Sequence, residues 1–224
     1  MDPDKQSAFA HRLAHDTQGA VLVEVTITLT LMLVFVLGSI EFLVLFYQWN
    51  AASKAVQVGA RVAAVSDPVA AGLGTLSNTV LSAGFPAGSP MPTFTVTCAG
   101  SAGVCSCNGA CPPGGFRYNS AAMNTIVFGR GSTSCSDASA VSNMGMCDVF
   151  SRITPANVVI TYAQTGLGYA GRPGGPVPTI TISLRDLPFR FVFLGGLVGL
   201  KDIDIPALQS SITAEDLSSR APSF

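Results

Sequence analysis

The strongest hydrophobic pattern in the chain is a nearly unbroken apolar run over residues 19–47. Two acids interrupt it, Glu24 near its start and Glu41 near its end, and residues 25–40 carry no charge. A helix over residues 20–47 would be about 42 Å long, which exceeds the roughly 30 Å hydrocarbon layer of a bilayer. The pattern therefore predicts a membrane-spanning helix.

The two acids would lie near opposite faces of the membrane, since about 25 Å of helix separates them. An ionised side chain at mid-bilayer costs on the order of 3 kcal/mol, so acids are tolerated near the ends of a span or when paired. Glu24 and Glu41 are therefore either interfacial residues without a particular role or residues that act in assembly.

The helical pattern continues beyond the apolar run and becomes amphipathic before Asp67-Pro68, which is predicted to end the helix. Tyr47 and Trp49 lie where interfacial aromatic residues are expected. Apolar side chains recur at spacings of four and three, which predicts one buried stripe: Ala51, Ala55, Val58, Val62 and Val65. Polar side chains fall on another face: Lys54, Gln57 and Arg61. We expect the stripe to pack on the chain's own domain, with packing against other subunits as the alternative.

The remainder of the chain is rich in short alternating segments that are typical of an antiparallel sheet with one covered face. Strands are predicted over residues 93–98, 157–162, 179–184, 189–194 and 209–214, with a short helix inside residues 74–84. The amphipathic helix is the expected cover of the sheet. The apolar segment 189–200 is too short for a second span, so it is either buried or in contact with a membrane or a partner.

All six cysteines gather in a loop-rich insert over residues 98–147: Cys98, Cys105, Cys107, Cys111, Cys135 and Cys147. Their even number favours three disulfides of open connectivity, each worth about 2–4 kcal/mol. Disulfides persist in oxidising compartments, which favours an extracytoplasmic domain and a cytoplasmic N-terminus. A four-thiolate metal site is the alternative, but the paired C-x2-C spacing of zinc sites is missing.

Charge and residue chemistry argue against nucleic acid and against catalysis. Twelve basic and thirteen acidic residues give a formal net charge of −1, without the basic clusters that nucleic acid requires. Both histidines, His11 and His15, precede the apolar run, so the predicted exported domain has no histidine for a catalytic triad or dyad or for a metal centre. The glycines Gly195, Gly196 and Gly199 lack the G-x-G-x-x-G pattern and its βαβ context, so they predict no nucleotide site. We expect no enzyme activity, cofactor, metal or small-molecule substrate.

Three separated elements of the N-terminal segment carry a family resemblance. Residues 19–24 (GAVLVE) resemble a prepilin processing site, with a glycine before the cut and a glutamate fifth after it. Residues 38–42 (GSIEF), 50–52 (NAA) and 58–61 (VGAR) follow in the order seen in TadE-like pilus-assembly proteins. The resemblance covers roughly residues 15–66.

This resemblance implies a minor pilin-like (pseudopilin) subunit of the Tad, or Flp, branch of type IV pili, acting in pilus biogenesis, adhesion or secretion by helix packing. A prepilin peptidase would cut between Gly19 and Ala20. The Glu24 carboxylate would then offset a neighbouring subunit's terminal ammonium, and Glu41 is the second assembly candidate. The implied partners are the inner membrane, prepilin peptidase, other Tad pilus subunits and platform proteins.

The expected architecture is α+β: a long N-terminal transmembrane and amphipathic helix packed on a small antiparallel sheet, with a disulfide-rich loop insert. We expect a cytoplasmic leader over residues 1–19, a helix over 20–66 and an extracytoplasmic β-rich domain over 67–224. Residues 21–47 would span the bacterial inner membrane once, and residues 48–66 would form the amphipathic extension. The alternative function is a disulfide-stabilised extracytoplasmic binding or enzymatic domain on an uncut membrane anchor.

Overall fold

The computed structural model describes residues 17–135, 144–189, 191, 193, 195–196, 199, 203–204, 208–214 and 217. The chain divides into two units. One comprises Met1–Leu45 and Arg190–Asp202, and the other comprises Phe46–Phe189 and Ile203–Phe224. Residues 1–16 of the predicted leader lie outside the described residues.

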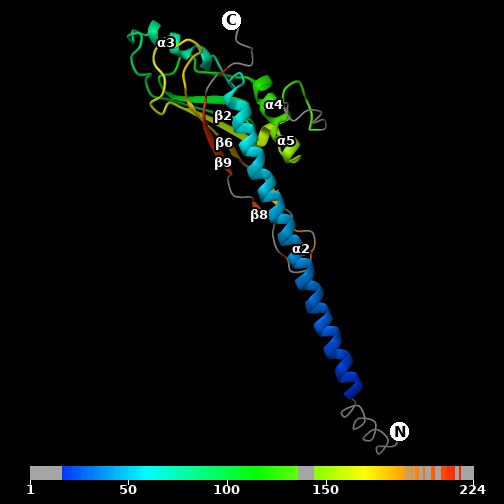
Figure 1. Cartoon of the computed structure of the whole chain (residues 1–224). Coiled ribbons are helices and arrows are strands. Elements are labelled where there is room, and N and C mark those ends of the chain that lie inside the picture. The colour runs from blue at the N-terminus through cyan, green and yellow to red at the C-terminus, as the bar shows by residue number, and fades with distance from the viewer. Residues whose placement is uncertain are drawn as a thin grey trace, which may run out of the picture. The chain divides into compact units, whose positions relative to one another are not determined.

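A single helix, α2 (Thr17–Ala64), continues from the first unit into the second (Figure 1). Its 48 residues contain no proline, so no missing N–H interrupts the hydrogen-bond ladder. The helix ends shortly before Asp67-Pro68, where the proline ring disfavours helical backbone in the preceding residue. Arg130 supports this end, because its guanidinium donates a 2.6 Å hydrogen bond to the Val65 carbonyl. The predicted long helix is thus confirmed.

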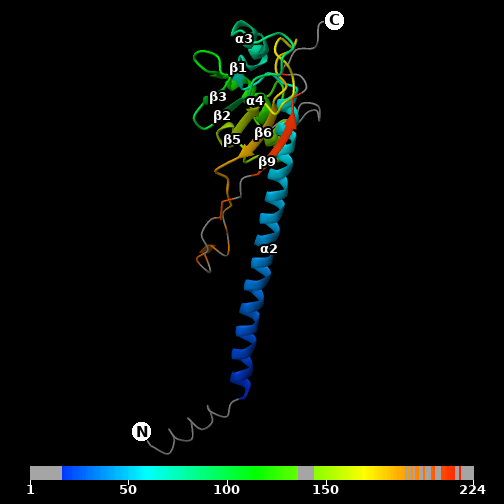
Figure 2. The ribbon, with the colours of Figure 1, turned by 90° about the vertical axis from the view of Figure 1, so that its left-hand side faces the viewer.

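The second unit contains a five-stranded antiparallel sheet with the strand order β3-β2-β5-β6-β9 (Figure 2). Its members are β2 (Phe94–Ala99), β3 (Val104–Gly109), β5 (Val158–Ala163), β6 (Thr179–Leu184) and β9 (Gln209–Thr213). Four of the five predicted strands are observed, and the ends of each differ from the predicted ends by at most one residue. In the fifth, over 189–194, only Phe189 is in a strand among the described residues, as part of β7 (Pro188–Phe189), which pairs with β8 (Ile203–Asp204).

The insert over residues 98–147 contains more regular structure than its loop-like composition predicts. Besides β3, it contains β4 (Arg117–Tyr118), α4 (Ser120–Phe128) and α5 (Met146–Val149), and β4 pairs with β1 (Ala70–Ala71). Asn119 caps α4, since its side chain accepts a 3.2 Å hydrogen bond from the Ala122 N–H. Met123 and Ile126 of α4 are fully buried. The α4 helix was not predicted, because the Gly- and Ser-rich residues on either side of it dominate the composition of the insert.

The described residues of the second unit also include three short helical elements. They are η1 (Leu73–Thr75), α3 (Leu76–Ser82) and η3 (Pro155–Asn157). The predicted short helix within residues 74–84 is therefore observed as α3, with Leu76 and Val80 buried.

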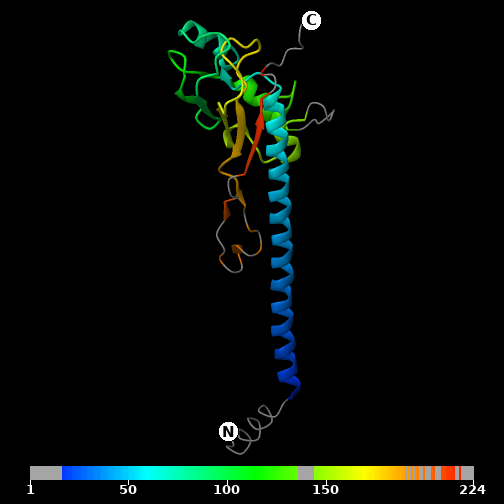
Figure 3. The same cartoon turned by 60° about the vertical axis from the view of Figure 1, so that its left-hand side comes forward.

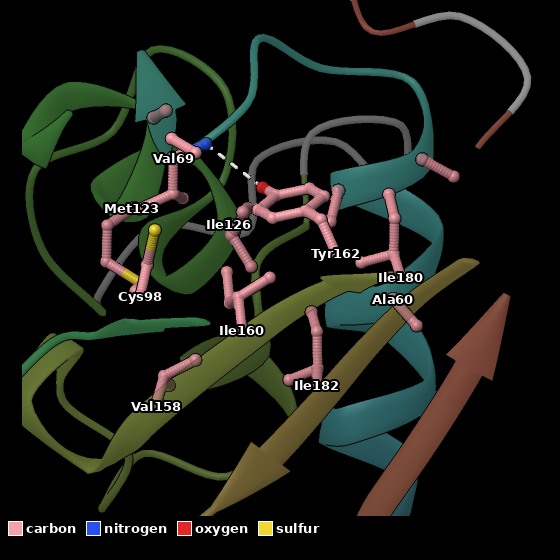
Figure 4. Close-up of a cluster of buried hydrophobic side chains, with 14 of the residues drawn as sticks. Ala60, Val69, Cys98, Met123, Ile126, Val158, Ile160, Tyr162, Ile180 and Ile182 are labelled. Atoms are coloured by element: carbon pink, nitrogen blue, oxygen red, sulfur yellow. Dashed lines mark hydrogen bonds between the residues drawn. The ribbon is translucent and has the colours of Figure 1, made fainter. Parts of the chain in front are cut away.

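The sheet has one buried apolar face and one polar face, as the alternation predicts. Buried side chains include Val158, Ile160, Tyr162, Ile180, Ile182 and Leu184. On the opposite face, hydroxyl groups pair across the strands, Thr97 with Thr161 at 3.2 Å and Thr181 with Ser211 at 2.8 Å. The C-terminal turns of α2 lie beside the strands in Figure 3, and Figure 4 shows Ala60 of α2 and Met123 of α4 around the buried face.

The buried stripe of α2 in the second unit differs from the predicted one. Of the five predicted positions only Ala55 is fully buried, and Val65 is 43% exposed. The buried residues are mostly small: Ala52, Ala55, Val56, Gly59, Ala60, Ala63 and Ala64. The expected packing of the stripe on the chain's own domain is confirmed, since Ala51 and Val62 also pack against the core. The prediction was wrong at Val65, because close packing favours the face with the smallest side chains. Lys54, Gln57 and Arg61 are exposed, as predicted.

Tyr162 connects the chain that follows α2 to the middle of the sheet. Its hydroxyl accepts a 3.0 Å hydrogen bond from the Val69 N–H, and both residues are fully buried (Figure 4). Burial raises the pKa of Tyr162 far above its ordinary value, so the phenol stays neutral. This bond joins residues 93 positions apart in sequence.

Replacing Tyr162 with phenylalanine leaves the buried Val69 N–H without this acceptor. The free energy of unfolding should fall by about 1–3 kcal/mol, the desolvation cost of an unsatisfied buried donor. Thermal unfolding of the full chain in detergent, followed by circular dichroism, measures the effect. Tyr169→Phe is the matched control, because the Tyr169 side chain is 46% exposed. Equal melting temperatures for the two variants would contradict a structural role of this bond.

Candidate membrane and assembly helix

The N-terminal half of α2 exposes a long, continuous apolar surface. Leu22, Met32 and Phe35 are 67%, 68% and 75% exposed, and the helix reaches a mean hydropathy of 2.5 over 18 residues, none of them buried. Exposure of such a surface to water costs about 25 cal/mol per Å². Among the described residues, one helix is long and apolar enough to cross a membrane, and it is this one.

The hydroxyl side chains in this half of α2 find acceptors within the helix itself. Thr26, Thr28 and Thr30 donate to carbonyls three or four residues earlier, at 2.7–3.0 Å. Ser39 does the same to the Phe35 carbonyl at 2.8 Å. Polar groups in a hydrocarbon layer must be satisfied internally, so these residues are compatible with a membrane span.

The predicted processing site lies at the beginning of α2 on an open surface. Gly19 and Ala20 are exposed, and a Cβ added at Gly19 would meet no atom within 4 Å. The peptide bond between them is nevertheless helical, whereas a peptidase needs an extended backbone. Glycine weakens the helix at this point, because its helix propensity is about 1 kcal/mol below that of alanine.

Glu24 and Glu41 lie in very different surroundings, although their sequence contexts are similar. Glu24 is exposed, whereas Glu41 is only 4% exposed. The Glu41 carboxylate accepts a hydrogen bond from the backbone N–H of Phe193, a residue of the same unit. One residue along the helix, the ring of Phe42 meets that of Phe191 edge to face, with centroids 6.4 Å apart.

The helix surface around Glu41 is partly covered as well. Residues at helical spacing on this face are buried or half-buried: Val34, Leu37, Gly38, Glu41 and Leu45. The contact of residue 193 with Glu41 was not expected from the sequence, because it is made by a backbone amide. A backbone donor leaves no signature in the side-chain sequence.

In the second unit, Gly59 permits direct contact between α2 and α5. A Cβ at Gly59 would lie 2.5 Å from Sδ and 2.7 Å from Cγ of Met146, which is fully buried. A second attachment is made by Arg152, whose guanidinium donates to the Gln48 side chain at 2.9 Å and to the Pro188 carbonyl at 2.6 Å. These contacts join the C-terminal half of α2 to its domain.

The six cysteines form three disulfides, which confirms the expected disulfide cross-linking. Cys98 pairs with Cys105 between the neighbouring strands β2 and β3, Cys107 pairs with Cys111, and Cys135 pairs with Cys147. A disulfide sulfur is not the thiolate that a zinc site uses. In the part of the chain that the structure describes, no three His, Cys, Asp or Glu side chains gather in a metal-binding arrangement.

Helix α2 thus defines a protein with one candidate membrane span attached to a disulfide-bonded α+β domain. Residues 19–61 match the family model of TadE-like proteins. The match begins at Gly19, includes Glu24, Glu41 and Gly59, and confirms the resemblance over α2. Searches of curated proteins and of solved structures gave no match.

Enlarging Gly59 should separate α2 from α5. We expect Gly59→Leu to lower the free energy of unfolding by about 1–3 kcal/mol, the usual cost of overpacking a core. Adding Met146→Ala should recover most of this loss, because it removes the side chain that the leucine meets. Thermal unfolding of the full chain measures both variants, with Gln57→Leu on the exposed face as the control. Failure of the second substitution to recover stability would contradict the inferred contact.

Proposed function

We propose that this chain is a minor pilin-like subunit of a Tad pilus assembly apparatus, inserted in the inner membrane through residues 21–47. The observation that carries the proposal is the exposed apolar half of α2, which begins at the Gly19–Glu24 motif and matches the TadE-like family. Residues 67–224 then form the extracytoplasmic domain. The disulfides support this orientation, because they persist in oxidising compartments.

The proposed mechanism is lateral packing of helices rather than catalysis. Prepilin peptidase removes residues 1–19 and leaves a free amine on Ala20. In an assembly of several subunits, that ammonium group meets the carboxylate of Glu24 on a neighbouring helix. Both charges would be costly if unpaired within an apolar bundle, so their pairing selects the correct stagger between subunits. The exposure of Glu24 in the single chain leaves its carboxylate accessible to such a partner.

Processing at Gly19 is tested by the intact mass of the membrane-extracted protein from piliated cells. The mass should lack residues 1–19, and Gly19→Leu should retain them because a side chain before the cut obstructs entry into the peptidase. Val23→Leu, which changes only an exposed apolar residue nearby, should still be cut. A full-length wild-type mass would refute processing and favour the uncut membrane anchor with a binding or enzymatic domain.

The assembly role of Glu24 is tested separately from cleavage. Glu24→Gln should be processed normally, yet its recovery with the assembled pilus apparatus should fall roughly tenfold or more, because one charge of a buried pair is left alone. Thr28→Val, one helical turn away, removes a hydroxyl whose bond is internal to the helix and should leave recovery unchanged. Wild-type recovery of the Glu24→Gln variant would exclude this pairing.

A further inference from the structure

The spacing of the two glutamates places at least one of them inside the hydrocarbon layer, if α2 spans the membrane as proposed. Glu24 and Glu41 are separated by about 25 Å of helix, and the layer is roughly 30 Å thick. A helix that crosses this thickness therefore cannot keep both Cα atoms outside it, and at least one carboxylate lies at or below the boundary unless its side chain extends along the helix. Tilting the helix makes the constraint stricter, because the path through the layer becomes longer.

Glu41 is the residue that the structure equips for this position. It is 4% exposed and accepts the Phe193 N–H, whereas Glu24 is exposed. If Glu24 lies at the inner boundary, a layer of about 20 helical residues ends near Leu45. Glu41 then lies about one turn, or roughly 5 Å, below the outer boundary. Its hydrogen bond to a backbone amide lowers the cost of that depth.

The same hydrogen bond fixes the depth of Phe193, since its amide meets Glu41 directly. The Phe193 side chain is 48% exposed, although phenylalanine is among the most hydrophobic residues. Phe191 packs against Phe42, which is itself 47% exposed on the apolar surface of α2. Phe191 itself is buried, so Phe193 is the phenylalanine of this pair that stays exposed, and its amide binds Glu41 on the apolar half of α2.

We propose that Phe193 is a second membrane-contacting residue, which enters the outer leaflet beside α2 and is anchored there by Glu41, while Phe191 packs on Phe42. Its neighbours are lipid acyl chains, because the exposed Phe193 side chain is held beside a helix half that is itself predicted to face lipid. A depth of about 5 Å suits a non-helical segment, since interfacial elements enter by roughly 5–10 Å while deeper backbone must be fully hydrogen-bonded. This inference rests on the proposed membrane insertion of α2.

The depth of position 193 is measured by fluorescence quenching in the full chain. Trp49 is the only tryptophan, so Trp49→Phe gives a silent background into which Phe193→Trp is placed. The protein is reconstituted into vesicles of phosphatidylcholine and phosphatidylglycerol whose acyl chains carry bromine either near the headgroup or near the chain end. We expect strong quenching by the shallow bromines and weaker quenching by the deep ones.

Two control tryptophans on the same background separate this inference from the proposed function. Leu43→Trp reports on the exposed surface of α2, and Phe85→Trp on an exposed position of the second unit. Quenching of Leu43→Trp alone, with Phe193→Trp behaving like Phe85→Trp, overturns the inference and leaves the membrane helix intact. Absence of quenching at both Leu43→Trp and Phe193→Trp refutes membrane insertion itself. Blue-shifted emission from Phe193→Trp without bromine quenching shows that another protein copy covers it, which also overturns the inference.

The anchoring role of Glu41 has its own readout. Glu41→Leu removes the acceptor, so the Phe193 amide should exchange its hydrogen roughly tenfold faster, as expected for loss of a hydrogen bond to a charged group. Glu41→Gln retains a carbonyl acceptor and should restore most of the protection. Exchange at Val69, bound to Tyr162 in the second unit, serves as the internal control for folding. Unchanged exchange at Phe193 in Glu41→Leu would overturn the anchoring.

Discussion

The rest of the structure depends on one constraint: a single helix must satisfy two different environments along its length. Over its first half α2 keeps large apolar side chains exposed, and over its second half it buries mainly alanine and glycine. Lipid imposes no packing geometry on exposed leucines, whereas a sheet and a short helix must approach the backbone closely to exclude water. Gly59 is the limiting case, because Met146 occupies the space of its absent Cβ. The size of the buried side chains therefore distinguishes the domain half of α2 from its candidate membrane-spanning half.

Most of the fold was predictable because its signals are local. The continuous helix, four of the five predicted strands and the single covered face of the sheet all follow from periodicity in the sequence. The α4 helix was missed because its apolar residues are flanked by cysteine-, glycine- and serine-rich segments that dominate the composition. The buried stripe of α2 was predicted in part: Ala55 is buried and Val62 packs against the core, but Val65 is exposed, since hydrophobicity alone ranks valine above the smaller residues that line the buried face.

Some residues of the candidate site could be predicted from a short local motif, whereas others depend on contacts between residues far apart in the sequence. Gly19, Ala20 and Glu24 are recognisable from a short motif, and residues 19–61 match the TadE-like family as one segment. The partner of Glu41 lies 152 residues further along the chain and acts through its backbone. Such a contact is invisible to motif reading. The second unit is likewise organised by distant pairs, such as Tyr162 with Val69 and Arg130 with the end of α2. These pairs fix where α2 meets its domain without resembling a functional motif.

The two glutamates show how one residue type acquires two roles through exposure. A carboxylate that is accessible in the single chain, like Glu24, is available to a charge on another subunit, so its energy depends on assembly. A carboxylate covered by its own chain, like Glu41, already accepts a hydrogen bond from that chain without any other subunit. Because any non-proline residue supplies the same amide at position 193, the hydrogen bond constrains Glu41 but not the identity of its partner side chain. Position 193 is therefore free to carry a phenylalanine suited to the surroundings of the loop.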